Sequence, residues 1–280
     1  MLSYRHSFHA GNFADVLKHS VLVHILEHLQ KKEKPFCYID THAGAGRYVL
    51  SSEQAEKTQE YKQGIAKLWQ AQDLPPMVAD YVARVKCFNT QNDLQHYPGS
   101  PLIAGQCMRP QDQLFLYELH RTDVELLRTV MRHDRRVHIY HADGFKHCMG
   151  LLPPSQRRGL ILIDPSYELK TDYDQVWETL LKLHKRFATG TYALWYPVVE
   201  RERINQLEAK IQASSLNNIQ LFELGQQADN AAWGMTASGM IVINPPWTLA
   251  AAMQLALPYL AMQLGVCAQG YYRIKQLKEE

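Results

Sequence analysis

Apolar residues recur along the chain in short runs that alternate with helical patterns. Seven of these runs have the length and the β-branched or aromatic content of strands. They cover residues 36–40, 114–118, 137–140, 160–163, 191–195, 219–224 and 239–243. Helical periodicity separates most of them, for example at residues 121–132 and 174–187. Strands that alternate with helices predict βαβ units and a mainly parallel sheet, which is the α/β class.

The first helix is predicted to begin after Asn12. Asn12, followed three residues later by Asp15, resembles a capping box. Apolar positions then cover much of the helix surface to about Gln30, so we expect this helix to pack firmly on a core.

Two intervals depart from simple alternation. About 70 residues separate Gly46 from Leu114, and residues 53–72 and 76–86 within them look helical. We therefore expect a small helical insertion over residues 50–100 within a single domain of residues 1–280. The last two predicted strands are joined by a polar segment, residues 225–238, which favours an antiparallel hairpin.

Composition narrows the class of protein. Of 280 residues, 46% are apolar and 21% charged, as in ordinary globular proteins. No apolar run approaches the ~20 residues that span a bilayer, and the first residues lack a signal-peptide core. The five cysteines are scattered without a CxxC pair, which argues against a zinc ribbon. We expect a cytoplasmic protein with reduced thiols and no membrane contact.

Charge and histidine spacing are less informative. The net charge of +2 neither demands nor excludes nucleic acid, although basic clusters such as residues 128–136 and 273–278 suggest either a basic face or solvated helix surfaces. His24 and His28 have the spacing of a metal pair on a helix, but no third ligand is evident, and we expect no metal.

A short motif, Asp-Pro-Ser-Tyr at residues 164–167, follows an apolar run that predicts a buried strand. The Asp164 carboxylate and the Pro165 carbonyl can accept the two N–H groups of an exocyclic amine, while the ring of Tyr167 stacks on the base. This arrangement directs the amine lone pair toward a methyl donor. The motif predicts methylation of a nucleobase amino group, with these three residues as the catalytic set.

The donor site is predicted from the turn after the first strand. Asp40 lies four residues before Gly44, and Gly44 and Gly46 permit a tight turn and close backbone approach to a ligand. The third glycine of the dinucleotide fingerprint is replaced by Val49. An acid at this spacing is typical of S-adenosylmethionine (SAM) sites; the alternative is a structural turn.

Two further acids extend this prediction. Glu118 ends the second strand, where a carboxylate can accept hydrogen bonds from both ribose hydroxyls. Asp143 follows the third strand and can accept the adenine amine of the cofactor, with Phe145 nearby. Because the carboxyl ends of parallel strands share one edge of a sheet, we expect these acids to line one pocket.

A second motif, Asn-Pro-Pro-Trp at residues 244–247, offers the same chemical groups. It follows the seventh predicted strand, far from the expected cofactor methyl. We therefore favour Asp164 as the catalytic residue and interpret Asn244 as part of a structural exit from the sheet.

Aromatic and basic residues are mixed at the start of the chain. Tyr4, His6 and Lys18 can form an arm over the target nucleotide. The alternatives are a docked N-terminal tail and, for Lys18, proximity to a cofactor carboxylate. The turn at residues 98–101 can return the chain to the cofactor pocket with Ser100 as a polar contact.

These residues resemble those of class I SAM-dependent amino-methyltransferases and, within them, the RlmJ family of bacterial 23S ribosomal RNA adenine-N6 methyltransferases. The resemblance extends over nearly the whole chain, through residues 4–12 (YRHSFHAGN), 40–48 (DTHAGAGRY), 97–101 (YPGSP) and 164–167 (DPSY). It implies a Rossmann-like, seven-stranded methyltransferase fold with a small helical insertion, SAM as the methyl donor, and one adenine of 23S ribosomal RNA as the target.

The resemblance also implies residue roles. Asp164 is expected to be catalytic and to contact the cofactor. The other expected cofactor contacts are His19, His42, Gly44, Gly46, Ser100, Glu118, Asp143 and Gly144. Ser166 replaces the second proline of the wider family. This difference puts no essential group in doubt, because the amine is expected to be bound by the Asp164 carboxylate and the Pro165 carbonyl.

Two alternatives remain. One is a DNA adenine-N6 methyltransferase, which is disfavoured because no DNA-reading domain is visible and the insertion is short. The other is a non-catalytic RNA-binding Rossmann domain. This alternative is disfavoured because the sequence retains the acids Asp164, Glu118 and Asp143. Nothing in the sequence indicates an obligate dimer, so we expect a monomer.

Overall fold

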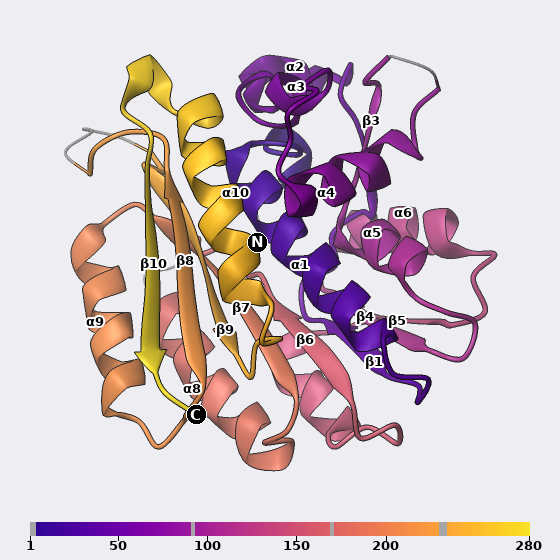
Figure 1. Ribbon diagram of the computed structural model, residues 1–280. Coiled ribbons are helices and arrows are strands. Elements are labelled where there is room, and N and C mark those ends of the chain that lie inside the picture. The colour runs from indigo at the N-terminus through magenta and orange to yellow at the C-terminus, as the bar shows by residue number, and fades with distance from the viewer. Residues whose placement is uncertain (1–3, 91–92, 169–170, 230–233) are drawn as a thin grey trace.

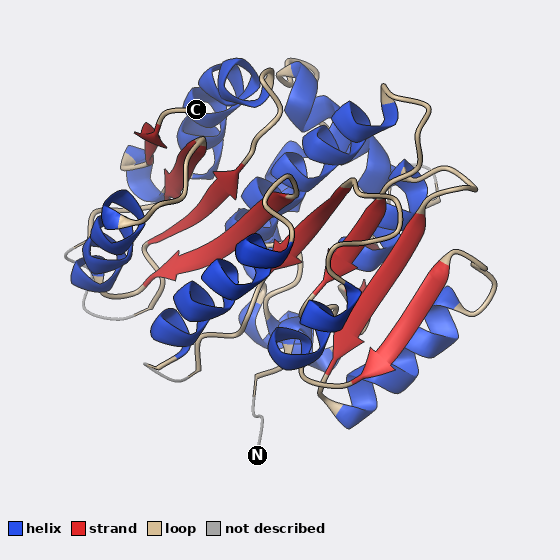
Figure 2. Ribbon diagram, turned by 90° about the horizontal axis from the view of Figure 1, so that it is seen from below, coloured by secondary structure: helices blue, strands red, loops and turns tan. Residues whose placement is uncertain are grey.

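The computed structural model describes residues 4–90, 93–168, 171–229 and 234–280. Its centre is an eight-stranded sheet with the order β10-β8-β9-β7-β6-β1-β4-β5 (Figures 1 and 2). The strands are β1 (Cys37–Asp40), β4 (Gln113–Glu118), β5 (Val137–His141), β6 (Gly159–Ile163), β7 (Thr191–Val198), β8 (Ile219–Gly225), β9 (Ala237–Ile243) and β10 (Tyr271–Lys278).

All seven predicted strands are present. The strands β5, β4, β1, β6 and β7 pair in parallel, and β8 and β9 pair antiparallel, so the predicted α/β class and the terminal hairpin are confirmed. The sheet nevertheless has eight strands instead of seven, because β10 adds antiparallel to β8. This edge strand carries Arg273 and Lys275 among its aromatic residues and therefore lacks the apolar run of the others.

Helices cover both faces of the sheet (Figure 1). One layer contains α1 (Phe13–Gln30), α5 (Ser100–Cys107) and α10 (Leu249–Leu264), whose buried residues share one core cluster. The opposite layer contains α8 (Asp172–Arg186) and α9 (Arg201–Ala213).

The strand before the motif illustrates why its sequence is uniformly apolar. In β6, Leu160 and Leu162 face the first layer, whereas Ile161 and Ile163 face the second. Burial on both faces requires apolar side chains at every position, as in other parallel sheets with two helical layers. The strand ends at Ile163, and the polar motif begins at the next residue, Asp164.

The helix α1 is almost entirely buried and begins as predicted. The side chain of Asn12 accepts a hydrogen bond from the backbone N–H of Asp15 at 3.0 Å. The Asp15 carboxylate does not return to Asn12 but accepts the N–H of Gly11 at 2.8 Å. This helix thus brings a buried carboxylate into its first turn.

The segment between β1 and β4 is bounded by a short antiparallel pair, β2 (Arg47–Val49) with β3 (His96–Pro98). Between them lie α2 (Glu53–Thr58), η2 (Glu60–Gln63), α3 (Ile65–Leu68) and α4 (Pro76–Lys86). The helix expected over residues 53–72 is broken at Gln59, which adopts φ 52°, and at Gly64. A Cβ on Gly64 would lie 2.1 Å from the Gly11 carbonyl oxygen, so only glycine fits against the start of α1.

In the described parts of the chain, no helix combines the length and apolar character needed to cross a membrane.

Candidate active site

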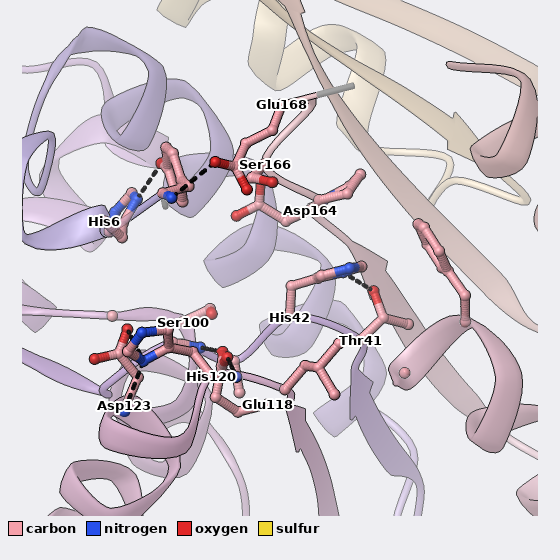
Figure 3. A pocket seen from close by; sticks show the side chains of 18 of the residues that line it. His6, Thr41, His42, Ser100, Glu118, His120, Asp123, Asp164, Ser166 and Glu168 are labelled. Atoms are coloured by element: carbon pink, nitrogen blue, oxygen red, sulfur yellow. Dashed lines mark hydrogen bonds and ion pairs between the residues drawn. The ribbon is translucent and has the colours of Figure 1, made fainter. Parts of the chain in front are cut away.

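The strand order creates a crevice at the carboxyl ends of the parallel strands. From β1 the chain moves outward through β4 and β5 and then returns to β6 on the other side of β1. Ligands of doubly wound sheets bind outside such a switch point. A cavity of about 250 Å³ lies there, with Asp164 and Glu168 on one side and Glu118 and Asp123 on the other (Figure 3).

The cavity brings together most residues that the sequence analysis singled out. Those that line it are Tyr4, His6, Lys18, His19, His42, Gly44, Ser100, Glu118, Asp143, Gly144, Asp164 and Pro165. Three predicted residues do not line it: Asp40, which is described below, Gly46 and Tyr167. Gly46 lies behind the turn, where its carbonyl accepts the N–H of Gly99 at 2.8 Å, and Tyr167 faces a neighbouring cavity.

The glycine turn after β1 is tied to the end of β4. Gly44 has φ +61°, and a Cβ there would lie 2.4 Å from the Tyr48 hydroxyl. Its N–H donates to Glu118 Oε2 at 2.8 Å, while Glu118 Oε1 accepts the N–H of His120 at 2.6 Å. Burial raises the pKa of Glu118 above its usual value, against these two hydrogen bonds. The carboxylate is thus fixed at the cavity wall with lone pairs still available.

Asp40 lies inside the protein and does not line the cavity. Its Oδ2 accepts hydrogen bonds from the hydroxyls of Tyr38 and Ser100, both at 2.7 Å, and its Oδ1 accepts the N–H of His42 at 3.1 Å. Burial raises the pKa of Asp40. The acid before the glycine turn therefore positions two residues of the cavity wall, Ser100 and His42.

His19 lines the cavity and has one ring nitrogen without a hydrogen-bond partner among the described residues. Its Nδ1 is 2.7 Å from the Tyr97 hydroxyl, which is 3.0 Å from the Tyr81 hydroxyl. Its Nε2 is buried and has no hydrogen-bond partner among the described residues. Burial lowers the pKa of His19 to about 3, so the ring is neutral at physiological pH. When Tyr97 donates to Nδ1, Nε2 carries the proton and is a donor available to a ligand.

His42 closes the cavity on the side of β5. Its Nδ1 lies 2.8 Å from the Thr41 hydroxyl, and its ring meets that of Phe145 edge-on with centroids 4.7 Å apart. Burial lowers the pKa of His42 to about 4. A neutral ring beside Phe145 offers a largely apolar surface to a ligand.

Asp164 is held by a buried lysine from α1. Lys18 Nζ donates to Asp164 Oδ2 at 2.6 Å and forms a 2.8 Å ion pair with Asp15 Oδ1. The side chains of Lys18, Asp164 and Asp15 are 5%, 14% and 1% exposed. Burial alone would lower the pKa of Lys18, but the two carboxylates raise it above its usual value. The ammonium is therefore charged throughout the physiological range.

The N-terminal arm, residues 4–12, crosses the mouth of the cavity. The Tyr4 hydroxyl lies 2.9 Å from His6 Nδ1, and His6 Nε2 lies 2.9 Å from Asp15 Oδ2. Arg5 pairs with Asp123 of α6 (Arg121–Met131) at 3.0 Å. The arm thus contacts both Asp15 of α1 and Asp123 on the far wall of the cavity.

A second cavity adjoins the first. The two share Tyr4, His6, Lys18, Asp164 and Ser166. The second is also lined by aromatic and apolar side chains, including Tyr167, Trp195 and Met235. Tyr167 adopts φ 52° and donates its hydroxyl proton to the Trp195 carbonyl at 2.7 Å, with ring centroids 5.7 Å apart.

Asn244 lies at the opposite end of the sheet from Asp164, because β9 runs antiparallel to β7. Its side-chain amide donates to the carbonyls of Ala188 and Gly190, both at 2.8 Å. The second Pro-containing motif is therefore a structural exit from the sheet in this fold.

Three of the other polar residues considered in the sequence analysis, His24, Arg273 and Lys275, have partners within the protein. His24 Nε2 lies 2.9 Å from the Thr248 hydroxyl, and the described residues contain no cluster of three or more histidine, cysteine or acidic side chains suited to a metal. Within the basic cluster of β10, Arg273 pairs with Glu208 and Glu223 and Lys275 pairs with Glu208, so these two charges are balanced inside the protein.

The sequence analysis missed three site residues: Asp15 and Trp195, which line the second cavity, and Asp123, which lines the first cavity opposite Asp164. The sequence analysis interpreted Asp15 only as the acid of the capping box that begins with Asn12. One signal was available, since Asp15, Lys18 and His19 are polar residues clustered in the first turns of a helix that is otherwise apolar on most sides.

The parallel sheet, the glycine turn and the acids after successive strands place the protein among class I methyltransferases. Within that class, the family model for "Ribosomal RNA large subunit methyltransferase D, RlmJ" matches residues 33–277, and the chain belongs to this family.

Curated relatives agree with this assignment. The ribosomal RNA large subunit methyltransferases J of Escherichia coli K12 and Haemophilus influenzae are 52% and 50% identical to this chain, and each alignment covers the whole of both proteins. A crystal structure of a Legionella pneumophila protein has a TM-score of 0.88 at 37% identity, over 96% of this chain and 98% of that chain.

Proposed function

We propose that the protein transfers a methyl group from SAM to the N6 amine of one adenine in 23S ribosomal RNA. The observation that carries this proposal is the position of Asp164 at the junction of two cavities, one lined by the acids after the strands and the other by aromatic rings. One cavity can hold the donor and the other an extruded base. The names of the two curated relatives support large-subunit ribosomal RNA as the substrate.

The first cavity has hydrogen-bonding groups that match those of SAM. The buried His19 Nε2 lacks a partner among the described residues and can donate to a carboxylate of the ligand. Glu118 can accept the ribose hydroxyls, and Asp143 can accept the adenine amine. Gly44 leaves room that a side chain would fill. When bound, SAM supplies the electrophilic methyl group.

The amine of the target is held by the motif itself. Lys18 contacts Oδ2 of Asp164, which leaves Oδ1 to accept one N–H of the amine. The Pro165 carbonyl accepts the other. These two acceptors orient the nitrogen lone pair toward the donor cavity. After transfer the amine is cationic, and Asp164 or water takes its extra proton.

Aromatic residues hold the base. Tyr167 lines the second cavity, where stacking on a base contributes ~1–3 kcal/mol. Tyr4 and His6 line both cavities and can contact the RNA around the target. Lys18 is 5% exposed, so its contact with substrate is restricted to the reacting nucleotide. We further propose that the protein acts as a cytoplasmic monomer.

Radiolabelled methyl transfer tests the proposal. Purified protein and labelled SAM are incubated with 23S RNA that lacks the modification and, separately, with duplex DNA. We expect label in RNA as N6-methyladenosine, identified by nuclease digestion and mass spectrometry. Transfer to DNA alone would favour the DNA enzyme, and RNA binding without SAM binding in calorimetry would favour a non-catalytic RNA-binding domain.

Two variants provide a matched comparison. Asp164→Ala should abolish transfer, whereas Asn244→Ala changes the equivalent position of the second motif and should leave transfer intact. Equal activity of the two variants would exclude the role proposed for Asp164.

A further inference from the structure

Asp15 is a buried carboxylate that contacts three groups near the site. Its Oδ2 accepts the N–H of Gly11 at 2.8 Å and lies 2.9 Å from His6 Nε2, and its Oδ1 lies 2.8 Å from Lys18 Nζ. Its side chain is 1% exposed. A carboxylate this deeply buried is costly unless it is paired, so its ionised form depends on these contacts.

Lys18 is held between two carboxylates. An ammonium has three N–H donors, and those of Lys18 reach Asp15 on one side and Asp164 on the other, at 2.8 and 2.6 Å. Its Nζ also lies 5.9 Å from the centroid of the Trp195 ring. A lysine on a flexible four-carbon stem with one carboxylate partner is free to bridge both oxygens of that partner. Asp15 holds the same ammonium through a second ion pair, and Lys18 donates to Oδ2 of Asp164.

We infer that Asp15 is a positioning residue for methyl transfer: it fixes Lys18 so that one oxygen of Asp164 stays available to the amine. This inference rests on the proposed function, because Asp164 Oδ1 matters only if an amine binds there. Asp15 also sets the charge of the group, since two carboxylates and one ammonium sum to a single negative charge. That charge suits an amine that becomes cationic during transfer.

The test compares Asp15→Asn with Asp112→Asn. Asparagine keeps an oxygen that can accept the Gly11 N–H but removes the charge that restrains Lys18. Asp112 is a matched control because it is also 1% exposed, accepts backbone N–H groups from Phe36 and Arg109, and pairs with the Arg109 guanidinium, yet it precedes β4 at the end away from the site. Both variants are checked for cooperative unfolding and for SAM affinity by calorimetry.

Single-turnover methyl transfer to 23S RNA is then measured at saturating SAM. We expect Asp15→Asn to lower the rate about 30-fold or more, which corresponds to ~2 kcal/mol of barrier, with SAM affinity changed less than about threefold. Asp112→Asn should stay within about threefold of the wild-type rate. A rate for Asp15→Asn that equals that of the control would overturn the inference.

A double-mutant cycle separates positioning from general structural support. If Asp15 acts through Lys18, Asp15→Asn should cause no further loss of rate in a Lys18→Met background. The same fractional loss in both backgrounds would mean that Asp15 only anchors the arm, and the inference would fail. Failure of the proposed function has a different signature, namely no transfer to RNA by the wild-type protein. In that case the same cycle, measured by urea unfolding, still tests the coupling between the two residues.

Discussion

Replacing Lys18 with methionine should destabilise the protein strongly. The change removes the ammonium that lies between Asp15 and Asp164 and keeps a side chain of similar length. The facing oxygens of the two carboxylates are at most about 5.4 Å apart, the two contact distances of 2.8 and 2.6 Å end to end. At that separation and an effective dielectric constant of about 20, two negative charges repel by ~3 kcal/mol.

Breaking a buried pair by removing one partner typically costs ~3–5 kcal/mol, and this range already includes the repulsion between the charges left behind. We therefore expect the free energy of unfolding of Lys18→Met to fall by about 3–5 kcal/mol at pH 7. Lys62→Met is the control: Lys62 is exposed, with its Nζ 5.8 Å from the Tyr61 ring centroid, and its loss should cost less than ~1 kcal/mol.

The dependence on pH identifies the cause. In the wild type, the raised pKa of Lys18 stabilises the fold below the unfolded value of ~10.4, and the lowered pKa of Asp15 stabilises it above ~3.9. Both contributions are present between pH 5 and 9. In Lys18→Met, one of the two carboxylates that have lost the ammonium can take up a proton as the pH falls, so the deficit relative to wild type should shrink toward pH 5.

Urea unfolding at pH 5, 7 and 8 measures these differences. Asp15→Asn provides the sharpest check, because it should destabilise the wild type but stabilise Lys18→Met by removing the repulsion. A Lys18→Met variant within 1 kcal/mol of wild type at every pH would refute the electrostatic reasoning, as would an equal effect of Asp15→Asn in both backgrounds.

Three further outcomes are expected at the cavity. Tyr97→Phe removes the hydroxyl that bonds His19 Nδ1, so SAM affinity in calorimetry should fall about 5-fold, equivalent to ~1 kcal/mol; an unchanged affinity would contradict the orienting role. Because the pKa of His19 is lowered to about 3, wild-type stability should decline as the pH falls below ~6.5, and His19→Gln should show a shallower decline in urea unfolding between pH 6.5 and 4.5. Asp164→Asn should lose methyl transfer by a factor of about 100 or more yet keep SAM affinity within about fivefold, measured by label transfer and calorimetry; parallel losses of both would assign Asp164 to donor binding alone.

The strands of the parallel core were predictable because each is buried on both faces. β6 lies under helices on both sides, and its five residues are all buried, so an apolar run was the only composition that fits. β10 was not predictable on this basis. Its Arg273 looked like part of a solvated basic cluster, whereas the fold pairs it with Glu208 and with Glu223, which is fully buried. Partners 50 and 65 residues away leave no local signal.

In the candidate site, too, some residues could be placed from the sequence and others could not. Glu118 and Asp143 could be placed because strand ends at one edge of a parallel sheet must converge. Asp164 could be preferred over Asn244 because the direction of the last hairpin sends its strand end to the other edge. The interior position of Asp40 could not be predicted, since it depends on the hydroxyls of Tyr38 and Ser100 closing over its carboxylate.

The charge at the walls of the two cavities differs in sign from the net charge of the protein. The chain carries a net charge of +2, yet the two cavities are walled by Asp15, Asp164, Glu118 and Asp143 with Lys18 as the buried cation between two of them. Acidic walls attract SAM, whose sulfonium is positive, more strongly than its demethylated product, which has lost that charge. In the proposed function, these acids therefore favour the donor over its demethylated product, and the attraction for an anionic RNA has to come from outside these walls.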